Sequence, residues 1–271
     1  MDLTSPKTIK EILQKHDLRP SKGFGQNFLI DRNVLDKIIR EAGLNKNETV
    51  LEIGPGIGTL TSELAKNAKQ VIAVEKDRNM CIVLKKTLEG ADNITVLNED
   101  ILKFNFNSFP DYKVVANIPY YLTSPLIRLL LENSNKPKEI ILMIQKEVAQ
   151  RICEKPPKMS LLSVSVQFYA DAKILFTVSK NSFLPAPKVD SAVIKITPLK
   201  QNKGVSADIF FKTVKAGFSH PRKQLLGNLS SAFDIGKEKT AGWLAKNNIN
   251  PKQRAETLSV QDWINLSKNH E

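Results

Sequence analysis

The stretch LEIGPGIGTLTSEL, residues 51 to 64, joins a short apolar run to an amphipathic segment through three glycines. Gly54, Gly56 and Gly58 allow the backbone to turn sharply and to come close to a ligand. Such a turn between a strand and a helix places the ligand at the carboxyl edge of a sheet, beside the helix N-terminus. Position 59 is Thr, where a dinucleotide fingerprint would have its last Gly. The turn alone therefore leaves two interpretations open, a nucleotide site and a plain structural turn.

Apolar runs and helical patterns alternate on both sides of this turn. We expect strands at 49–53, 70–75, 93–100, 113–117 and 139–145 and helices at 34–43, 59–68, 77–90 and 124–133. This βαβ series predicts a mostly parallel, Rossmann-like sheet with helices on both faces. Three more strands, at 161–170, 172–179 and 191–198, would give the sheet an antiparallel edge.

The pattern changes after Pro198. Four short helices are expected at 210–218, 222–233, 238–248 and 260–268, and QNKG, residues 201–204, is the expected linker. We therefore predict an α/β domain over residues 1–200 and a small all-α domain over residues 201–271.

Charge points to the class of partner. The chain has 40 Lys and Arg against 28 Asp and Glu, a net charge of +12, and residues 201–271 hold 11 of the basic and six of the acidic residues. A polyanion is the expected partner, and the alternative is a basic protein without one. No apolar run approaches the ~18 residues of a membrane span, and the start, MDLTSPKTIK, lacks the apolar core of a signal peptide. We expect a cytoplasmic protein.

Cysteine and histidine are too few and too widely spaced to predict a disulfide framework or a metal site. Cys81 and Cys153 lie far apart and imply no disulfide framework. His16, His220 and His270 show no ligand spacing, so no metal site is expected.

Two acidic residues end neighbouring strands. Glu75 ends the strand at 70–75, where a carboxylate can accept hydrogen bonds from both ribose hydroxyls of NAD or S-adenosylmethionine. Asp100 ends the next strand and can accept from an adenine amine, although it could also be a plain surface acid. No His or Tyr–Lys pair is placed for hydride transfer, which favours S-adenosylmethionine. Glu52 lies inside the strand and is expected to orient the loop.

The sequence NIPY, residues 117–120, ends a strand in the same row of loops. An adenine amine is a poor nucleophile because its lone pair is delocalised into the ring. The Asn117 side-chain oxygen and the Ile118 carbonyl can accept its hydrogens, and Pro119 holds Ile118 extended. Tyr120 can stack on the base. A turn with a buried Tyr is the alternative. Methylation of a cytosine carbon would need a Cys nucleophile, and neither Cys lies in these loops.

Taken together, these motifs resemble the ribosomal RNA adenine dimethylase family of the bacterial small-subunit type. The resemblance covers nearly the whole chain, and its motifs are KGFGQNFLIDRNVLDKI (22–38), LEIGPGIGTLTSEL (51–64), VIAVEKD (71–77), NEDIL (98–102), NIPYYLTSPLI (117–127), MIQKEVAQR (143–151), FLPAPKVDSAVIKI (183–196) and RAETLSVQDWINL (254–266). It implies a class I methyltransferase that dimethylates two adjacent adenosines in the 3′-terminal hairpin of small-subunit ribosomal RNA.

The resemblance also implies roles for single residues. Asn117 would carry catalysis, and Phe183 would stack on the target adenine opposite Tyr120. Gly54 would contact the methionine part of S-adenosylmethionine, Glu75 the ribose and Asp100 the adenine. The expected cofactor-binding set is Gln26, Asn27, Leu29, Gly54, Gly56, Glu75, Lys76, Asp100, Ile101 and Asn117.

The expected partner is the immature small ribosomal subunit, with a monomer as the default oligomeric state. Candidates for phosphate contacts are Lys22, Arg151, Lys188, Arg222, Lys223 and Arg254, although each could be an ordinary surface charge. The chain departs from the family at FSHPRKQLLGN (218–228), where Pro221 replaces one basic residue of a pair and puts part of the RNA surface in doubt.

Three other functions remain as alternatives. A large-subunit dimethylase of the macrolide-resistance type shares the NIPY loop, but PAPKVDSAV (185–193) and RAETLSV (254–260) favour the small-subunit type. A non-catalytic RNA-binding assembly factor would keep the same scaffold. An NAD oxidoreductase is the least favoured of the three.

Overall fold

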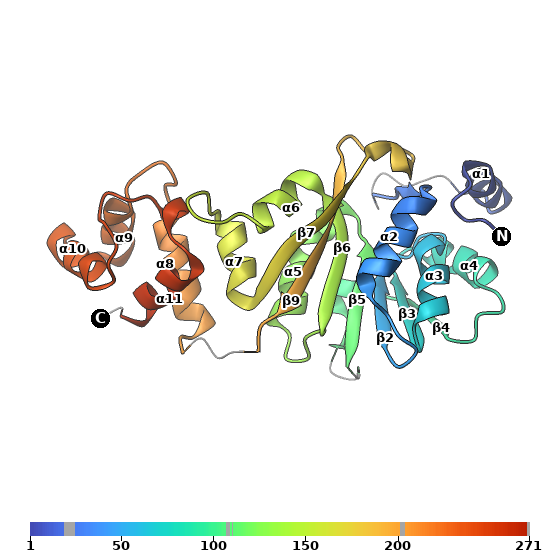
Figure 1. Cartoon of the computed structure of the whole chain (residues 1–271), viewed down its shortest axis with the longest axis horizontal. Helices are drawn as coiled ribbons and strands as arrows, with labels where there is room; N and C mark the ends of the chain where they lie inside the picture. Colours follow the sequence, from blue (N-terminus) through green and yellow to red (C-terminus); the bar gives the residue numbers. More distant parts are fainter. Residues whose placement is uncertain (19–24, 107–108, 110, 201–203, 270–271) are drawn as a thin grey trace. The chain divides into compact units, whose positions relative to one another are not determined.

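A computed structural model describes residues 1–18, 25–106, 109, 111–200 and 204–269. The chain divides into two compact units, each described here by itself (Figure 1). The first unit comprises Met1–Ala149 and Lys173–Pro198, and the second comprises Gln150–Ala172 and Leu199–Glu271. The predicted boundary at residue 200 falls beside Pro198, but the second unit also includes a segment from the middle of the chain.

The first unit is built from alternating strands and helices. Its helices are α1 (Pro6–Lys15), α2 (Arg32–Ala42), α3 (Thr59–Asn67), α4 (Arg78–Thr87), α5 (Thr123–Glu132) and the 3₁₀ turns η1 (Ile101–Lys103), η3 (Tyr120–Leu122) and η4 (Lys180–Ser182). Its strands are β1 (Phe28–Leu29), β2 (Thr49–Ile53), β3 (Gln70–Glu75), β4 (Ile94–Asn98), β5 (Tyr112–Asn117), β6 (Glu139–Gln145), β8 (Phe183–Leu184) and β9 (Ser191–Pro198). The chain passes between the units within α6 (Lys146–Ile152) and β7 (Ala170–Val178).

Seven strands of the described residues form one sheet in the order β4-β3-β2-β5-β6-β9-β7. The first five run parallel, and β9 pairs antiparallel with β6. The predicted Rossmann-like sheet with an antiparallel edge is therefore confirmed. The chain reverses its direction of travel across the sheet between β2 and β5, which is where ligands bind in open α/β sheets.

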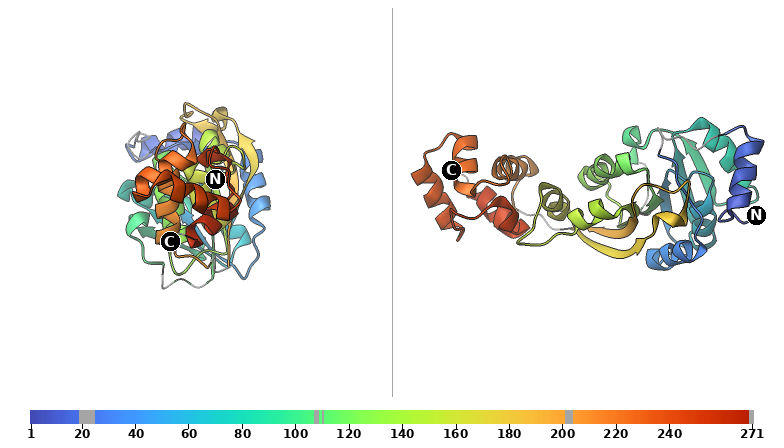
Figure 2. Two further views of the ribbon diagram at one scale, coloured as in Figure 1. Left: turned by 90° about the vertical axis from the view of Figure 1, so that its left-hand side faces the viewer. Right: turned by 90° about the horizontal axis from the view of Figure 1, so that it is seen from above.

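Helices cover both faces of this sheet. Helices α2 and α3 pack on one face, where Leu35, Ile38 and Leu64 join Val50 and Val115 of the strands in one buried cluster. Helix α5 lies on the opposite face (Figure 2). The strands between the two layers are apolar on both sides, as a buried parallel sheet requires.

Side-chain caps decide where several of these helices begin. Asp77 accepts a hydrogen bond from the Asn79 N–H at the start of α4, which confirms the predicted Asp cap. Asp31 caps α2 through the N–H groups of Asn33 and Val34. Each cap satisfies donors that the first helical turn leaves unpaired.

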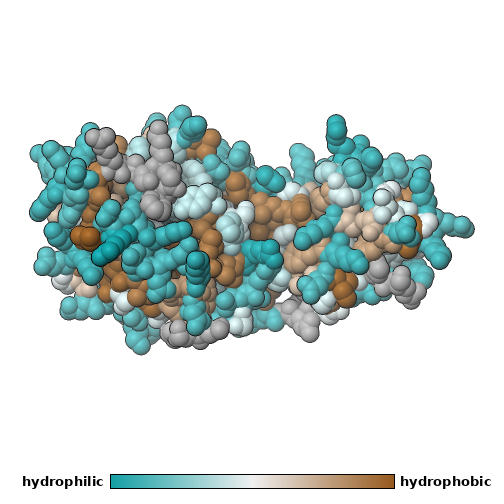
Figure 3. Space-filling model, turned by 180° about the vertical axis from the view of Figure 1, so that it is seen from behind, coloured by the Kyte–Doolittle hydropathy of each residue, from teal (hydrophilic) through white to brown (hydrophobic). Residues whose placement is uncertain are grey.

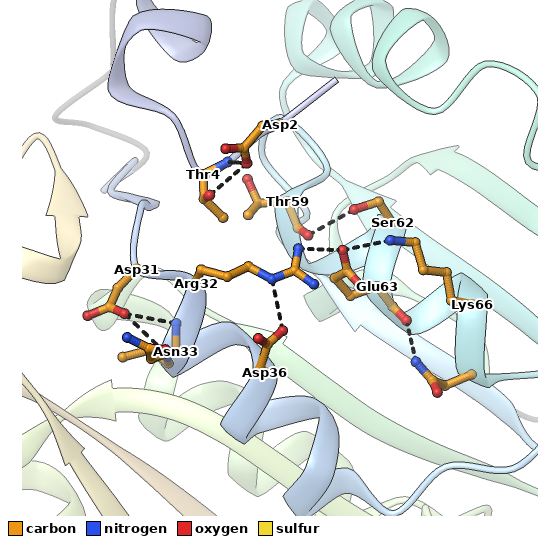
Figure 4. A network of polar contacts seen from close by, with 12 residues as sticks. Asp2, Thr4, Asp31, Arg32, Asn33, Asp36, Thr59, Ser62, Glu63 and Lys66 are labelled. Carbon is orange, nitrogen blue, oxygen red and sulfur yellow. Dashed lines mark hydrogen bonds and ion pairs between the residues drawn. The ribbon is translucent and has the colours of Figure 1, made fainter.

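Polar contacts also join α2 to α3 (Figure 4). The Arg32 guanidinium lies 2.9 Å from Glu63 and 2.9 Å from Asp36, and Lys66 lies 2.9 Å from Glu63. The Glu63 side chain is nearly buried, whereas Arg32 and Lys66 are each more than half exposed. The Arg32–Glu63 ion pair therefore joins α2 to α3 at the surface of the unit.

One predicted strand is wrong. Residues 161–170 are predicted to form a strand, but Leu161–Tyr169 form helix α7. A capping box between Ser160 and Ser163 starts this helix. The Phe168 ring stacks on Phe210 with centroids 3.9 Å apart. Helix packing thus overrides a period of two in the sequence.

The second unit is a helical bundle around one apolar cluster. Besides α7, it contains α8 (Ala207–Gly217), α9 (Leu225–Phe233), α10 (Lys237–Lys246), η5 (Ala255–Thr257) and α11 (Val260–Lys268). All four tail helices were predicted. Trp263 at its centre is fully buried, together with Phe210, Leu229 and Leu244.

Among the described residues, no helix is both long and apolar enough to cross a bilayer. The same residues contain no cluster of three or more His, Cys, Asp or Glu placed to hold a metal ion. Hydrophilic side chains cover most of the face seen in Figure 3, with apolar ones visible between them.

Gly217 provides a test of the second core. A Cβ at this position would overlap the ring of Trp263 and lie 3.0 Å from Leu225 Cδ1. We expect Gly217→Ala to lower the free energy of unfolding by about 1–3 kcal/mol, the usual effect of overpacking. Both tryptophans of the chain, Trp243 and Trp263, lie in this unit, so urea denaturation followed by tryptophan fluorescence reports on it.

Gly242→Ala is the matched control for this substitution. Gly242 lies in α10, and a Cβ there meets nothing within 4 Å. This variant should gain about 0.5–1 kcal/mol of stability because Ala favours a helix over Gly. Equal midpoints for the two variants would contradict the packing described.

Candidate active site

The sheet of the first unit splits at the carboxyl ends of β2 and β5. Their pairing stops at Leu51 opposite Val114. By contrast, β2 stays paired with β3 as far as Ile53, and β5 stays paired with β6 as far as Asn117. The last residues of β2 and β5 are therefore held by their outer neighbours and not by each other. A pocket opens at this split.

All of the predicted catalytic and cofactor residues line that pocket. They are Gln26, Asn27, Leu29, Gly54, Gly56, Glu75, Lys76, Asp100, Ile101, Asn117, Ile118, Pro119, Tyr120 and Phe183. The structure thus brings together residues from six separate stretches of the chain. It also adds wall residues that the sequence did not mark, among them Phe28, Leu102 and Tyr121.

The Gly-rich turn forms one wall by close approach. Gly54 and Gly56 have φ of 66° and 60°, in the left-handed region that favours glycine. A Cβ on Gly56 would lie 3.2 Å from the Phe28 ring, and one on Gly54 would lie 3.5 Å from Pro119 Cδ. The turn therefore needs glycine for its conformation and also, at Gly56, for space.

Two buried glutamates, Glu75 and Glu52, lie beneath this turn and differ in their hydrogen bonds. Glu75 Oε1 accepts the Asp77 N–H at 2.8 Å, and burial raises the pKa of the Glu75 carboxyl. Burial raises the pKa of Glu52 more, to about 8, and its Oε2 has no hydrogen-bond partner among the described residues. Burial thus favours the uncharged form of Glu52 and lessens the negative charge at the pocket floor.

Asp100 stays ionised at the other end of the pocket. Its Oδ2 forms an ion pair with Lys76 Nζ at 3.0 Å, and its Oδ1 accepts the Leu102 N–H at 3.1 Å. These contacts, the Lys76 hydrogen bond first, lower the pKa of the Asp100 carboxyl. A carboxylate with this geometry can accept one more hydrogen bond, as an adenine amine would offer.

The Asn117 side chain is held by a residue 90 positions earlier. Asn117 Nδ2 donates to the Asn27 carbonyl at 3.3 Å. The amide is planar, so this bond turns Oδ1 away from Asn27 and leaves it available as an acceptor. The segment around Asn27 is fixed in turn, because Gln26 Nε2 donates to Asp77 Oδ2 at 3.1 Å.

Tyr120 lines the pocket and is held by a second hydrogen bond between residues far apart in the sequence. Its hydroxyl lies 2.8 Å from Ser191 Oγ at the start of β9, and either oxygen can be the donor. Ser191 is fully buried. Burial raises the pKa of the Tyr120 phenol, which therefore stays protonated in neutral water. Ser191 was not predicted, and local sequence carries no signal for it.

Phe183 completes the wall. It belongs to β8, which pairs antiparallel with β1 so that Phe183 lies opposite Leu29. The side chain is 3% exposed and joins the buried cluster of the unit. Phe183 is thus both a core residue and a pocket residue.

Comparison with known proteins settles the family. The profile of the ribosomal RNA adenine dimethylase family matches residues 19–270. The chain belongs to this family. It is 43% identical to Ribosomal RNA small subunit methyltransferase A of Bacillus licheniformis, covering 98% of this chain and 96% of the relative. The protein of the same name from Clostridioides difficile is 42% identical with the same coverage.

Solved structures agree with this assignment. A dimethyladenosine transferase from Plasmodium falciparum matches with a TM-score of 0.75 and 29% identity, over 88% of this chain and 95% of that one. The 23S rRNA methyltransferase ErmE matches with a TM-score of 0.74 and 26% identity, over 90% and 99%. The chain is a class I methyltransferase of the dimethylase family, and its methyl donor is S-adenosylmethionine.

The predicted phosphate contacts of this dimethylase do not all fall in one unit. Lys22 lies outside the described residues. Lys188 is exposed in the first unit, and the other four candidates are exposed in the second. None of the five described candidates forms an ion pair with an acidic side chain of the described chain.

Ser191→Ala tests the hold on Tyr120. Loss of one hydrogen bond is worth about 0.5–1.5 kcal/mol, so we expect the KM of methyl transfer for RNA to rise by about two- to tenfold. The dissociation constant for S-adenosylhomocysteine should not change.

A double-mutant cycle with Tyr120→Phe separates this bond from general damage. Both single variants remove the same hydrogen bond, so the double variant should be no worse than either one. Ser182→Ala is the control, because its hydroxyl instead contacts Asp31 at 2.9 Å. Additive effects of Ser191→Ala and Tyr120→Phe would show that the bond does not position Tyr120.

Proposed function

We propose that this dimethylase methylates the 6-amino groups of two adjacent adenosines in the 3′-terminal hairpin of small-subunit ribosomal RNA during subunit assembly. The observation that carries the proposal is the Asn117 amide, which lines the pocket with Ile118 and is fixed there by its Nδ2 donating to the Asn27 carbonyl, so that its oxygen is not used by that bond. The curated relatives at 42–43% identity, named as small-subunit enzymes, support the choice of subunit. As part of the same proposal, the enzyme works as a monomer, without a metal, in the cytoplasm.

The pocket residues fit S-adenosylmethionine. Gly54 and Gly56 admit a ligand to the backbone, and Glu75 can accept from the ribose hydroxyls at the end of β3. Asp100 can accept from the adenine amine, with Lys76 and Ile101 beside it. Gln26, Asn27 and Leu29 would close the pocket from the N-terminal side. The cofactor supplies an electrophilic methyl group on a positively charged sulfur that leaves as a neutral thioether.

The NIPY loop, residues 117–120, would make the target amine a better nucleophile. Asn117 Oδ1 and the Ile118 carbonyl would accept hydrogen bonds from the amine and favour a pyramidal nitrogen, whose lone pair is then less delocalised into the ring. The bound cofactor would supply the methyl group: the nitrogen–carbon bond would form as the carbon–sulfur bond breaks, and the methylated amine would lose a proton to water. No strong base is needed, so alignment and exclusion of water carry the catalysis.

The target base needs an aromatic slot because it must leave its stack to reach Asn117. Tyr120, held by Ser191, and Phe183, held by β8, would enclose its two faces. Extrusion costs a few kcal/mol, so a looped or single-stranded site is the expected substrate.

Asn117→Ala tests the chemistry. Removing a group that stabilises developing charge typically costs about 10²- to 10³-fold in kcat. We expect this loss in transfer of labelled methyl groups to unmethylated small subunits, with affinities for S-adenosylhomocysteine and RNA nearly unchanged. Asn93→Ala is the control, because the Asn93 amide binds the Ala65 and Ala68 carbonyls and does not line the pocket.

The outcomes separate the alternatives. Transfer by Asn117→Ala at the wild-type rate would overturn the assigned role. If the wild type itself methylates no small subunit, the protein is an RNA-binding assembly factor. If it methylates naked large-subunit RNA instead, it is an enzyme of the macrolide-resistance type.

Four of the basic candidates lie on neighbouring segments of the second unit. The Leu225 N–H bonds the Gln253 carbonyl at 2.8 Å, which joins the segments that carry Arg222, Lys223 and Arg254. The Met159 N–H bonds the Glu256 carbonyl at 2.8 Å, and Ser160 Oγ lies 3.5 Å from the Arg151 carbonyl. We call Arg151, Arg222, Lys223 and Arg254 the basic face and propose that it binds RNA phosphates.

Pro221 fits this role. The Lys223 N–H bonds the His220 carbonyl at 2.9 Å, which closes a turn with Pro221 at its second position. Proline favours that position because its φ is preset. The Asn228 amide bonds the Gly217 and His220 carbonyls at 2.6 and 3.1 Å and anchors the turn. The departure at Pro221 thus removes a charge but stiffens the loop that presents Arg222 and Lys223.

Salt dependence tests the basic face. We expect the logarithm of the RNA association constant to fall linearly with the logarithm of salt concentration, because bound phosphates release counterions. The double variant Arg222→Ala/Lys223→Ala should flatten the slope by about 0.7–0.9 per lost contact. Lys237→Ala/Lys239→Ala removes the same charge from α10 and is the control. Equal slopes for the two double variants would place the RNA elsewhere.

A further inference from the structure

Tyr121 is an exposed aromatic residue beside the pocket. Its side chain is 58% exposed, and among the exposed large hydrophobic residues of the described chain it is the only aromatic one. It lines the pocket together with Tyr120, but nothing in the mechanism above uses it.

The 3₁₀ turn η3 sets its direction. Such a turn has three residues per turn, so successive side chains point about 120° apart. Tyr120 points inward to Ser191 and Leu122 is buried, which leaves Tyr121 facing outward. The turn is closed by the Leu122 N–H on the Pro119 carbonyl at 2.9 Å and by Thr123 Oγ1 on the Tyr120 carbonyl at 2.9 Å.

Tyr121 lies at the rim of the pocket. A Cβ at Gly25 would be 3.9 Å from Tyr121 Cδ1, so the ring rests against the segment that leads to Gln26. Leu102, 42% exposed, is a second exposed apolar residue of the pocket lining.

We propose that the Tyr121 ring is a second nucleobase subsite, on which the base next to the target adenosine stacks. This inference rests on the proposed function. A base that leaves its stack uncovers one face of its neighbour, and aromatic side chains bind such faces without regard to sequence. Tyr121 directly follows Tyr120 of the target-base slot, so the two surfaces are continuous.

The exposure of Tyr121 favours RNA over the cofactor as its ligand. Ile101, beside the proposed adenine position at Asp100, is only 5% exposed. More than half of Tyr121 still faces solvent. Its free face is therefore suited to a ligand that arrives from outside the pocket.

The test uses a hairpin RNA with 2-aminopurine beside the target adenosine, bound to the full-length protein with S-adenosylhomocysteine. Stacking quenches 2-aminopurine, so we expect quenching with wild type and Tyr121→Phe and its loss with Tyr121→Ala and Tyr121→Leu. Loss of one base–aromatic stack is worth about 1–3 kcal/mol, which is about 5- to 150-fold in RNA affinity. Tyr121→Leu is the matched apolar control without an aromatic face.

Three results would overturn the subsite. Equal quenching with wild type and Tyr121→Ala would show that no base stacks there. Weaker S-adenosylhomocysteine binding by Tyr121→Ala, with RNA affinity unchanged, would assign the ring to the cofactor. A wild type that neither binds nor methylates the RNA would refute the proposed function and this subsite with it, whereas the first two results leave the proposed function standing.

Discussion

The separation of β2 from β5 is the constraint on which the site depends. Because their pairing ends at Leu51 and Val114, the backbone after each strand turns to its own side. The Gly-rich turn follows one strand and the NIPY loop the other, and both line the pocket. The segment around Asn27 lines it as well, and the Asn27 carbonyl accepts from the Asn117 amide. A sheet paired to its end at this point would have no pocket and no acceptor directed into it.

The carboxyl groups around the pocket lie in different electrostatic surroundings. Three carboxyl groups lie in or just after neighbouring strands, and their surroundings differ. Burial raises the pKa of Glu52, burial also raises that of Glu75 although it accepts backbone N–H groups, and the hydrogen bond from Lys76 lowers that of Asp100. The pocket can therefore offer acceptors to hydroxyl and amine groups without placing three like charges together. Environment, more than residue type, sets these roles.

Consecutive tyrosines are put to different uses by one 3₁₀ turn. The same three-residue period that directs Tyr120 to Ser191 directs Tyr121 to solvent. In the second unit, a capped turn at Pro221 presents Arg222 and Lys223, and backbone hydrogen bonds bring the segments of Arg254 and Arg151 beside them. In both places a short, rigid loop positions side chains for a ligand, and the helices or strands behind it hold the loop.

Local sequence predicted most of the fold and, of the residues that line the pocket, Gly54, Gly56, Glu75, Asp100 and the NIPY loop, whereas Gln26, Asn27, Leu29 and Phe183 came from the family resemblance alone. Strands 49–53, 70–75 and 139–145 were predicted to the residue, as was the Asp77 cap, because period, turn residues and caps act over a few positions. Tertiary structure decided what local patterns cannot encode. Residues 161–169 became a helix through a cap and Phe210, Asn117 found its partner 90 residues away, and Tyr120 found Ser191 71 residues away. Such partners lie far apart in the sequence, so local patterns carry no signal for them, and only the tertiary structure brings them within contact distance.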